Sequence, residues 1–118
     1  MPIWTIGPLS ERPQLTLNAW GVYEVPLYGD TEPWTRHFVG FAREDCVGHV
    51  SSPVKAFDPV TGSGVTRSGR VYQLQDRPGS DADARYVWEK WKVVNGISAE
   101  RDVSDEVFAE MQCGASGR

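Results

Sequence analysis

Cysteine and histidine are the residues of this 118-residue chain that could bind a metal ion or supply a nucleophile and a base. Cys46 and His49 form a Cys-x-x-His pair, and His37 is the other of the two histidines. A tetrahedral zinc site needs four ligands, so this group would require a fourth from distant Cys113 or from a carboxylate. The pattern favours a cysteine in a turn beside a histidine in a strand. We therefore expect no metal and no cofactor.

Two further motifs begin like binding sites but lack essential parts. The string "DADAR", from Asp81, starts like a calcium loop, but Arg85 replaces an oxygen ligand and the later Gly and Glu are absent. The string "GSG" at 62–64 is not followed by a helix whose N-terminus could hold phosphate. The serines lack the context of a nucleophile elbow. We expect no catalytic residues, and a protein that is not an enzyme.

Basic and aromatic residues are the remaining candidates for contact with a partner. A group of arginines around a predicted hairpin could meet phosphate or an acidic protein. Charged hairpin tips also serve solubility and discourage edge pairing, so both interpretations stand. Aromatic residues without an assigned place in the core suit interface anchors. The predicted partner-binding residues are Trp4, Trp34, Arg67, Arg70, Arg77, Arg85 and Tyr86.

The string "RYVWEKW", residues 85–91, has the period of an amphipathic helix. At about 100° per residue, one stripe of this helix is apolar and contains Ala84, Val87, Trp88, Trp91 and Val94. We expect both tryptophans in the core, because aromatic residues that stack on bases need exposure and basic neighbours on the same face. Tyr86 and Val93 fall on the far side, where the last helix is the nearest element to cover them.

Strand patterns precede this helix. From 15 to 27 every odd position is apolar or glycine, which predicts a strand with one face inward and a bulge or bend near Gly21. Further strands are expected at 36–43 and 49–57, followed by a hairpin over 65–74 with Ser68 and Gly69 at its tip. These segments predict an α+β fold: an antiparallel sheet or partly open barrel of about five strands, with one packed helix and a short C-terminal helix.

Capping signals define the predicted helices. Ser80 followed by an acid at 83 resembles a capping box, and Gly96 should end this first helix. Ser104 is the expected N-cap of the last helix, which Gly114 should stop. Residues 1–118 are expected to form a single domain, with 1–13 an extended N-terminal arm and 114–118 a flexible tail.

Composition excludes several classes of protein. The 40% hydrophobic content is typical of a folded domain rather than a disordered chain. Twelve basic against 16 acidic residues, a net charge of −4, argue against a general binder of nucleic-acid phosphates. No stretch has the pattern of a signal peptide or a membrane span. Because the two cysteines are far apart in sequence, we expect no disulfide and a cytoplasmic location.

A set of motifs between residues 36 and 91 resembles a known family: "RHFVGF", "GHVSSPV", "FD", "GVTRSGRVYQL" and "DADARYVWEKW". They are similar to those of a family of short uncharacterised bacterial proteins associated with plasmids, prophages and other mobile elements. The resemblance implies no catalytic residues that could be assigned here. As a class, small acidic proteins of mobile elements resemble inhibitors of host defence, including anti-CRISPR proteins, which occupy a partner's surface.

The sequence therefore predicts a non-catalytic protein-binding module. Its expected partner is a host or mobile-element protein, and its role is that of an anti-defence (anti-CRISPR-like) or accessory factor. The alternative is a nucleic-acid-binding regulator that uses the Arg67 and Arg70 hairpin, with affinity that falls steeply as salt rises. The sequence does not indicate an oligomeric state.

Overall fold

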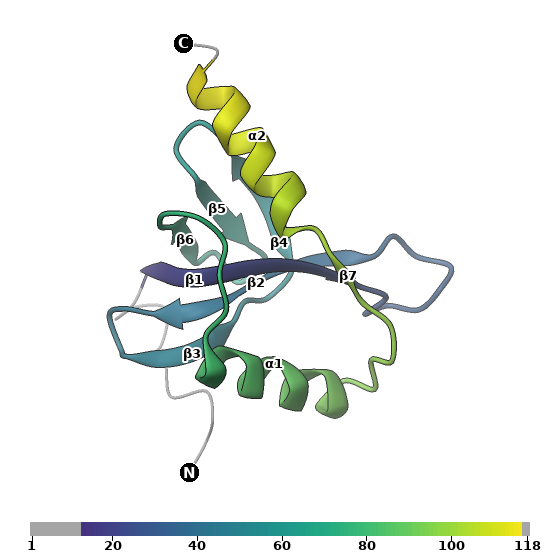
Figure 1. Cartoon of the computed structure of the whole chain (residues 1–118). Helices are drawn as coiled ribbons and strands as arrows, with labels where there is room; N and C mark the ends of the chain where they lie inside the picture. Colours follow the sequence, from purple (N-terminus) through teal and green to yellow (C-terminus); the bar gives the residue numbers. More distant parts are fainter. Residues whose placement is uncertain (1–12, 117–118) are drawn as a thin grey trace.

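The structure, a computed structural model, describes residues 13–116. An open sheet lies between two helices (Figure 1). In chain order the elements are β1 (Gln14–Val25), β2 (Thr35–Ala42), β3 (Val47–Val50), β4 (Val54–Asp58), β5 (Ser63–Thr66), β6 (Val71–Leu74), α1 (Ala82–Val94), β7 (Arg101–Asp102) and α2 (Ser104–Ser116). The α+β class is confirmed.

The sheet is mixed, which corrects the prediction of about five antiparallel strands. The seven strands have the order β3-β2-β1-β6-β5-β4, with short β7 beside β1. β1 is antiparallel to β2 but parallel to β6. Periodicity shows where strands lie, but it carries no information about which strands pair across the chain.

The strand predicted at 49–57 is two strands at opposite ends of this order. It divides at residues 51–53 into β3 and β4, because proline cannot donate to a ladder and Pro53 interrupts the pairing. Such a short connection spans at most about 14 Å. The two ends of the sheet must therefore lie close together, and β4 does approach β2. The sheet curls without a ladder between those two strands.

A bulge in β1 exchanges the faces of its two halves. The register with β2 shifts between Asn18 and Gly21, and Ala19 has a φ of +48°. The bulge expected near Gly21 is thus confirmed, but the prediction that all odd positions share a face is wrong beyond it. One extra residue reverses the alternation, so Tyr23 and Val25 face the opposite cluster. One core cluster takes the buried residues Leu15, Leu17, Trp20 and Val22 from β1.

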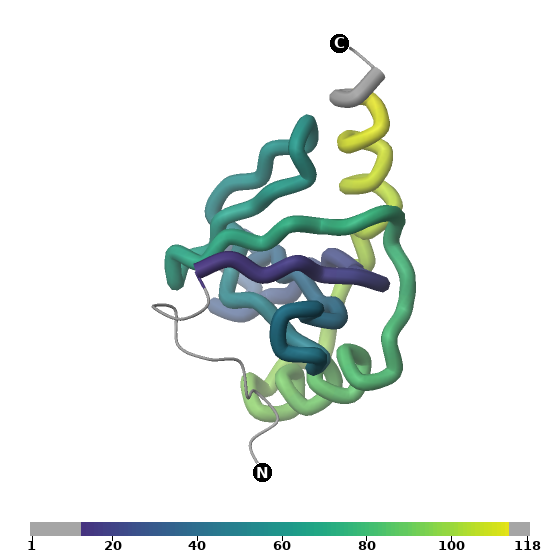
Figure 2. Tube along the Cα trace, turned by 90° about the vertical axis from the view of Figure 1, so that its left-hand side faces the viewer, coloured from purple at the N-terminus to yellow at the C-terminus, as the bar shows by residue number. Residues whose placement is uncertain are grey.

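The two helices stabilise opposite faces of the sheet. α2 packs through Val107 against the cluster that contains Trp20, while α1 packs through Val87 and Trp88 against the cluster that contains Val25. Figures 1 and 2 show the helices on either side of the strands. The single sheet therefore supports two small cores rather than one.

The inward placement of Trp88 is confirmed, since its side chain is 0% exposed, and Trp91 is partly buried against it. Ala84 and Val87 are buried as predicted, each 2% exposed, but three other expectations for α1 are wrong. Val94 is 74% exposed, and Val93 is 78% exposed. Tyr86 is 52% exposed, because α2 lies across the other face of the sheet and cannot cover it.

The N-terminal end of α1 differs from the prediction by one residue. Asp81, not Ser80, is the N-cap, and its carboxylate accepts the N–H of Ala84 at 2.9 Å. At the other end Gly96 has a φ of +67°, which confirms it as the glycine that ends the helix. The sequence thus located this helix correctly within one residue.

Ser104 has a different role from the predicted N-cap of α2. Its hydroxyl accepts the N–H of Val22 in β1 at 2.9 Å, while the carboxylate of Asp102 accepts the N–H of Ser104 at 2.9 Å. The start of α2 is therefore fastened to β1. At its other end α2 continues past Gly114 to Ser116, so Gly114 does not stop it.

Gly48 in β3 lies directly beneath the first turn of α1. Its N–H donates to the carboxylate of Asp83 at 2.6 Å, and a Cβ added here would lie 2.4 Å from the backbone nitrogen of Ala84. We expect Gly48→Ala to lower the free energy of unfolding by about 1–3 kcal/mol, because the backbone of α1 must move away. Urea denaturation measures this change. An unchanged midpoint would show that α1 and β3 do not approach so closely.

Candidate functional site

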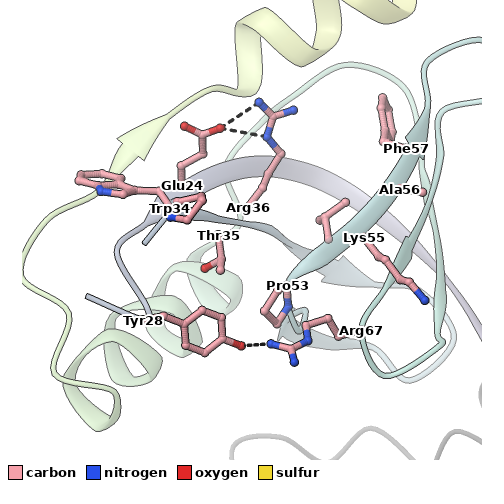
Figure 3. A pocket seen from close by; sticks show the side chains of 12 residues that line it. Glu24, Tyr28, Trp34, Thr35, Arg36, Pro53, Lys55, Ala56, Phe57 and Arg67 are labelled. Carbon is pink, nitrogen blue, oxygen red and sulfur yellow. Dashed lines mark hydrogen bonds and ion pairs between the residues drawn. The ribbon is translucent and has the colours of Figure 1, made fainter. Parts of the chain in front are cut away.

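A groove of about 750 Å³ lies between the start of β2 and the edge of β4 (Figure 3). It occupies the place where the curled sheet fails to close. Its walls combine aromatic, basic and apolar side chains. The lining residues are Glu24, Tyr28, Pro33, Trp34, Thr35, Arg36, Pro53, Val54, Lys55, Ala56, Phe57 and Arg67.

Two connections position the groove's side chains. The β5–β6 hairpin carries Arg67, whose N–H donates to the carbonyl of Pro53 at 2.9 Å. Gly69 follows with a φ of +93°, which confirms the tight turn predicted at this tip. The β1–β2 connection carries Tyr28 and Trp34 at its two ends. Its Gly29 has a φ of +96°, a conformation that favours glycine.

One end of the groove is a charged cluster around Glu24. The carboxylate of Glu24 pairs with Arg36 at 2.9 Å and with Arg101 of β7 at 3.0 Å. The guanidinium of Arg101 lies 4.4 Å from the ring centroid of Trp34. Two arginines sharing one carboxylate leave this end with a positive charge, and the indole is held between the cation and the groove.

The other end of the groove is formed by Arg67 and Tyr28. The guanidinium of Arg67 donates to the Tyr28 hydroxyl and lies 5.5 Å from the centroid of the Tyr28 ring. Among the described residues no carboxylate pairs with Arg67. Thr35 lies between the two ends, and the amine of Lys55 points away from the groove's centre (Figure 3). Positive charge thus brackets a less polar middle.

The structure brings two of the seven predicted partner-binding residues into this groove, Trp34 and Arg67. Tyr86 is exposed on α1, with the Lys90 amine 5.6 Å from its ring centroid. Trp4 lies outside the described residues. The predicted aromatic anchors that are described therefore lie on separate elements.

The other three predicted arginines do not line this groove. Arg70 lies beside the buried Tyr72, Arg77 lines a separate hollow next to α2, and Arg85 on α1 donates to the Tyr23 hydroxyl at 3.3 Å. Only Arg67 of the four faces the groove, because tertiary packing directs the hairpin tip toward the β3–β4 connection.

Sequence reasoning missed several groove residues: Tyr28, Arg36, Lys55 and Phe57. A signal was present in "YGDTEPWTR", where two aromatic residues and an arginine surround a turn. This turn appeared to be only a connection between strands. The contribution of β4 had no signal in the sequence, because its position opposite β2 depends on the curl of the sheet.

His49 and Tyr72 form a buried pair that the sequence did not indicate. The rings stack with centroids 5.5 Å apart, and the Tyr72 hydroxyl lies 2.6 Å from His49 Nε2. Burial, with a smaller contribution from Arg70, lowers the pKa of His49 to about 4, and burial raises the pKa of Tyr72 to about 12. Near neutral pH both groups are therefore uncharged, and a hydrogen bond joins the hydroxyl and the imidazole.

His37 is also buried, and both of its ring nitrogens have partners. Nδ1 lies 2.8 Å from the carbonyl of Ser51, to which it donates, and Nε2 lies 2.7 Å from the Thr35 hydroxyl. Burial lowers the pKa of His37, although the bond to Ser51 opposes this shift. These contacts stabilise the interior.

The cysteines and histidines do not assemble into a chemical site within residues 13–113. Cys46 is exposed, with its thiol 3.6 Å from the carbonyl of Arg43, whereas His49 is directed inward to Tyr72. No group of three or more His, Cys, Asp or Glu among the described residues could hold a metal ion. The chemistry that the groove offers is that of its basic and aromatic side chains, which can bind a partner through charge and aromatic contact.

Comparison with known proteins gives no evidence about function. No family model, curated protein or solved structure matches the chain. Within the described part of the chain, neither helix is long and apolar enough to cross a membrane.

Proposed function

We propose that this protein is a non-catalytic protein-binding module and that the groove between β2 and β4 is its partner-binding site. The observation that carries the proposal is the composition of the groove: Trp34, Tyr28 and Arg67 line one hollow. Tryptophan, tyrosine and arginine are the residues that most often dominate the energy of protein interfaces. Their own contacts hold these side chains in place before a partner arrives, which lowers the entropic cost of binding.

The aromatic rings favour a protein partner over nucleic acid. Arg101 lies over the Trp34 ring and Arg67 lies close to the Tyr28 ring, so the chain's own cations already occupy one position against each ring. Stacking of successive bases needs open aromatic faces in a strongly basic channel. The overall charge of −4 also opposes a polyanion.

The biological setting that we propose is that of an anti-defence or accessory factor of a mobile element, acting on a host or mobile-element protein. This part of the proposal is supported by the resemblance of the motifs between residues 36 and 91. A preformed binding groove on a small acidic protein is consistent with a factor that works by occupying a partner's surface.

Arg67→Glu tests the proposed site. We expect this variant to retain a specific protein from a bacterial lysate at least tenfold less than the wild type. A charge-assisted hydrogen bond contributes about 1.5–3 kcal/mol, and 1.4 kcal/mol is a factor of ten. Arg77→Glu is the matched control, because it makes the same change of charge at an exposed arginine beside α2. The retained protein is then purified and its affinity measured directly.

Each outcome distinguishes the proposal from its alternative. A partner lost with Arg67→Glu but kept with Arg77→Glu, after nuclease treatment, supports the groove. Equal retention by both variants, or no retained protein, contradicts the proposal. Capture of nucleic acid alone, with an affinity that falls steeply as salt rises, would instead support a nucleic-acid-binding regulator.

A further inference from the structure

The groove lies along an unpaired edge of the sheet. β4 is the last strand in the order and pairs with β5 on one side. Its other side faces the groove, which is lined by Val54, Lys55, Ala56 and Phe57 in succession. Four consecutive residues of one strand therefore border the same hollow, and no other described strand pairs with them.

The opposite wall is also strand backbone that has no partner on that side among the strands of residues 13–116. β2 pairs with β1 from Thr35 onward, but its ladder with β3 begins only at Val39. Thr35 and Arg36, at the start of β2, line the groove across from β4. The gap between β2 and β4 is thus bordered by two strands.

The charges at this edge select its occupant. The lining contains three of the chain's 12 basic residues, Arg36, Lys55 and Arg67, but only one of its 16 acidic residues, Glu24. A second copy of the chain paired along β4 would bring two such basic edges together, and the exposed Lys55 is a residue type that opposes edge pairing of this kind. A negatively charged segment meets no such repulsion.

We infer that the groove binds an extended acidic segment of a protein, which adds to the sheet as a strand along β4 and fills the gap toward β2. Main-chain hydrogen bonds to β4 would hold the segment, and Arg67 and Arg36 at the two ends would bind its carboxylates. This inference rests on the proposed function and specifies the form and charge of the partner.

The test uses labelled peptides of about nine residues, enough to span β4 with flanks, in which Glu alternates with varied apolar residues. One matched peptide carries Lys in place of Glu. Two further peptides keep Glu but carry N-methyl groups on every second backbone nitrogen, one peptide on the odd positions and the other on the even positions. We expect the Glu peptides to bind wild type and Arg77→Glu, and to bind Arg67→Glu at least tenfold more weakly. Lys peptides should bind at least tenfold more weakly than Glu peptides.

Backbone pairing has its own readout. Methylation of one alternate set of nitrogens should weaken binding at least tenfold, and methylation of the other set should have little effect, because only every second N–H of a strand faces one neighbour. Hydrogen exchange of the β4 amides should slow when the Glu peptide binds. This measurement needs no substitution in the protein, so a failure to fold cannot confuse it.

Failure of the inference is separable from failure of the proposed function. Glu peptides that bind without an effect of methylation or a change in β4 exchange would overturn strand addition. No binding of Glu peptides, or equal binding of Lys peptides, would overturn the acidic occupant. In each of these cases Arg67-dependent capture of a folded protein could still support the groove as a binding site.

Discussion

Trp88→Ala should lower the free energy of unfolding by about 3–5 kcal/mol, the usual cost of deleting a large buried aromatic side chain. Trp88 is 0% exposed and stacks on Tyr23 and on Trp91, with ring centroids 5.2 Å apart in both pairs. Its loss would leave a cavity beneath α1, where the helix meets β2 and β3. Urea denaturation followed by circular dichroism measures the change.

Trp88→Phe is the control for this cavity. The indole Nε1 of Trp88 is buried and has no hydrogen-bond partner within the described part of the chain, so phenylalanine removes an unsatisfied donor while keeping an aromatic ring. We expect its cost to be clearly smaller than that of alanine. Val93→Ala, at a 78% exposed position on the same helix, should change stability little. An alanine variant at Trp88 that unfolds with wild-type stability would contradict the assigned core.

Acidification should destabilise the protein by about 3 kcal/mol through His49 alone, an estimate from the gap between its ordinary pKa of 6.5 and a folded value of about 4. The unfolded chain binds a proton at His49 as the pH falls below 6.5, while the folded protein keeps the buried ring neutral. The free energy of unfolding therefore decreases as the pH is lowered through this window, and the loss is complete below about pH 4. Burial lowers the pKa of His37 as well, which acts in the same direction.

His49→Gln separates this contribution from other titrations. Glutamine keeps a polar side chain near the Tyr72 hydroxyl but cannot be protonated in this range. The slope of unfolding free energy against pH between about 6.5 and 4.5 should therefore be clearly smaller in the variant. Glu44 contributes mainly below this window, because hydrogen bonds from Thr16 outweigh burial and lower its pKa below 4.5. An unchanged slope would show that His49 titrates normally in the folded protein.

Local patterns in the sequence were sufficient for the features that depend on neighbouring residues. Periodicity was sufficient for the α+β class and for the helix that contains Trp88. Glycine, which readily adopts a positive φ, marked the end of this helix at Gly96 and the tight turn at Gly69. Each of these depends on a few consecutive side chains and their backbone conformation. Such features need no knowledge of the distant parts of the chain.

The sequence was not sufficient for features that depend on contacts between distant parts of the chain. The bulge at Ala19 reversed the faces of β1, although alternation alone predicted a single face. The packing of α2 on the opposite face of the sheet left Val93 exposed. Val94 is exposed as well, although helical periodicity placed it in the core. Burial is decided by which surfaces meet, and a helix wheel or a period of two does not contain that information.

The sequence by itself determined the building blocks: strand segments, two helices, a buried tryptophan and a group of arginines around a predicted hairpin. Only the tertiary structure decided that Arg67 and Trp34, far apart in the chain, line one groove. The reason is physical: the short connection from β3 to β4 brings the two ends of the sheet together. β4 then lies near β2 without pairing with it, and the groove between these two strands is not encoded by any local stretch of sequence.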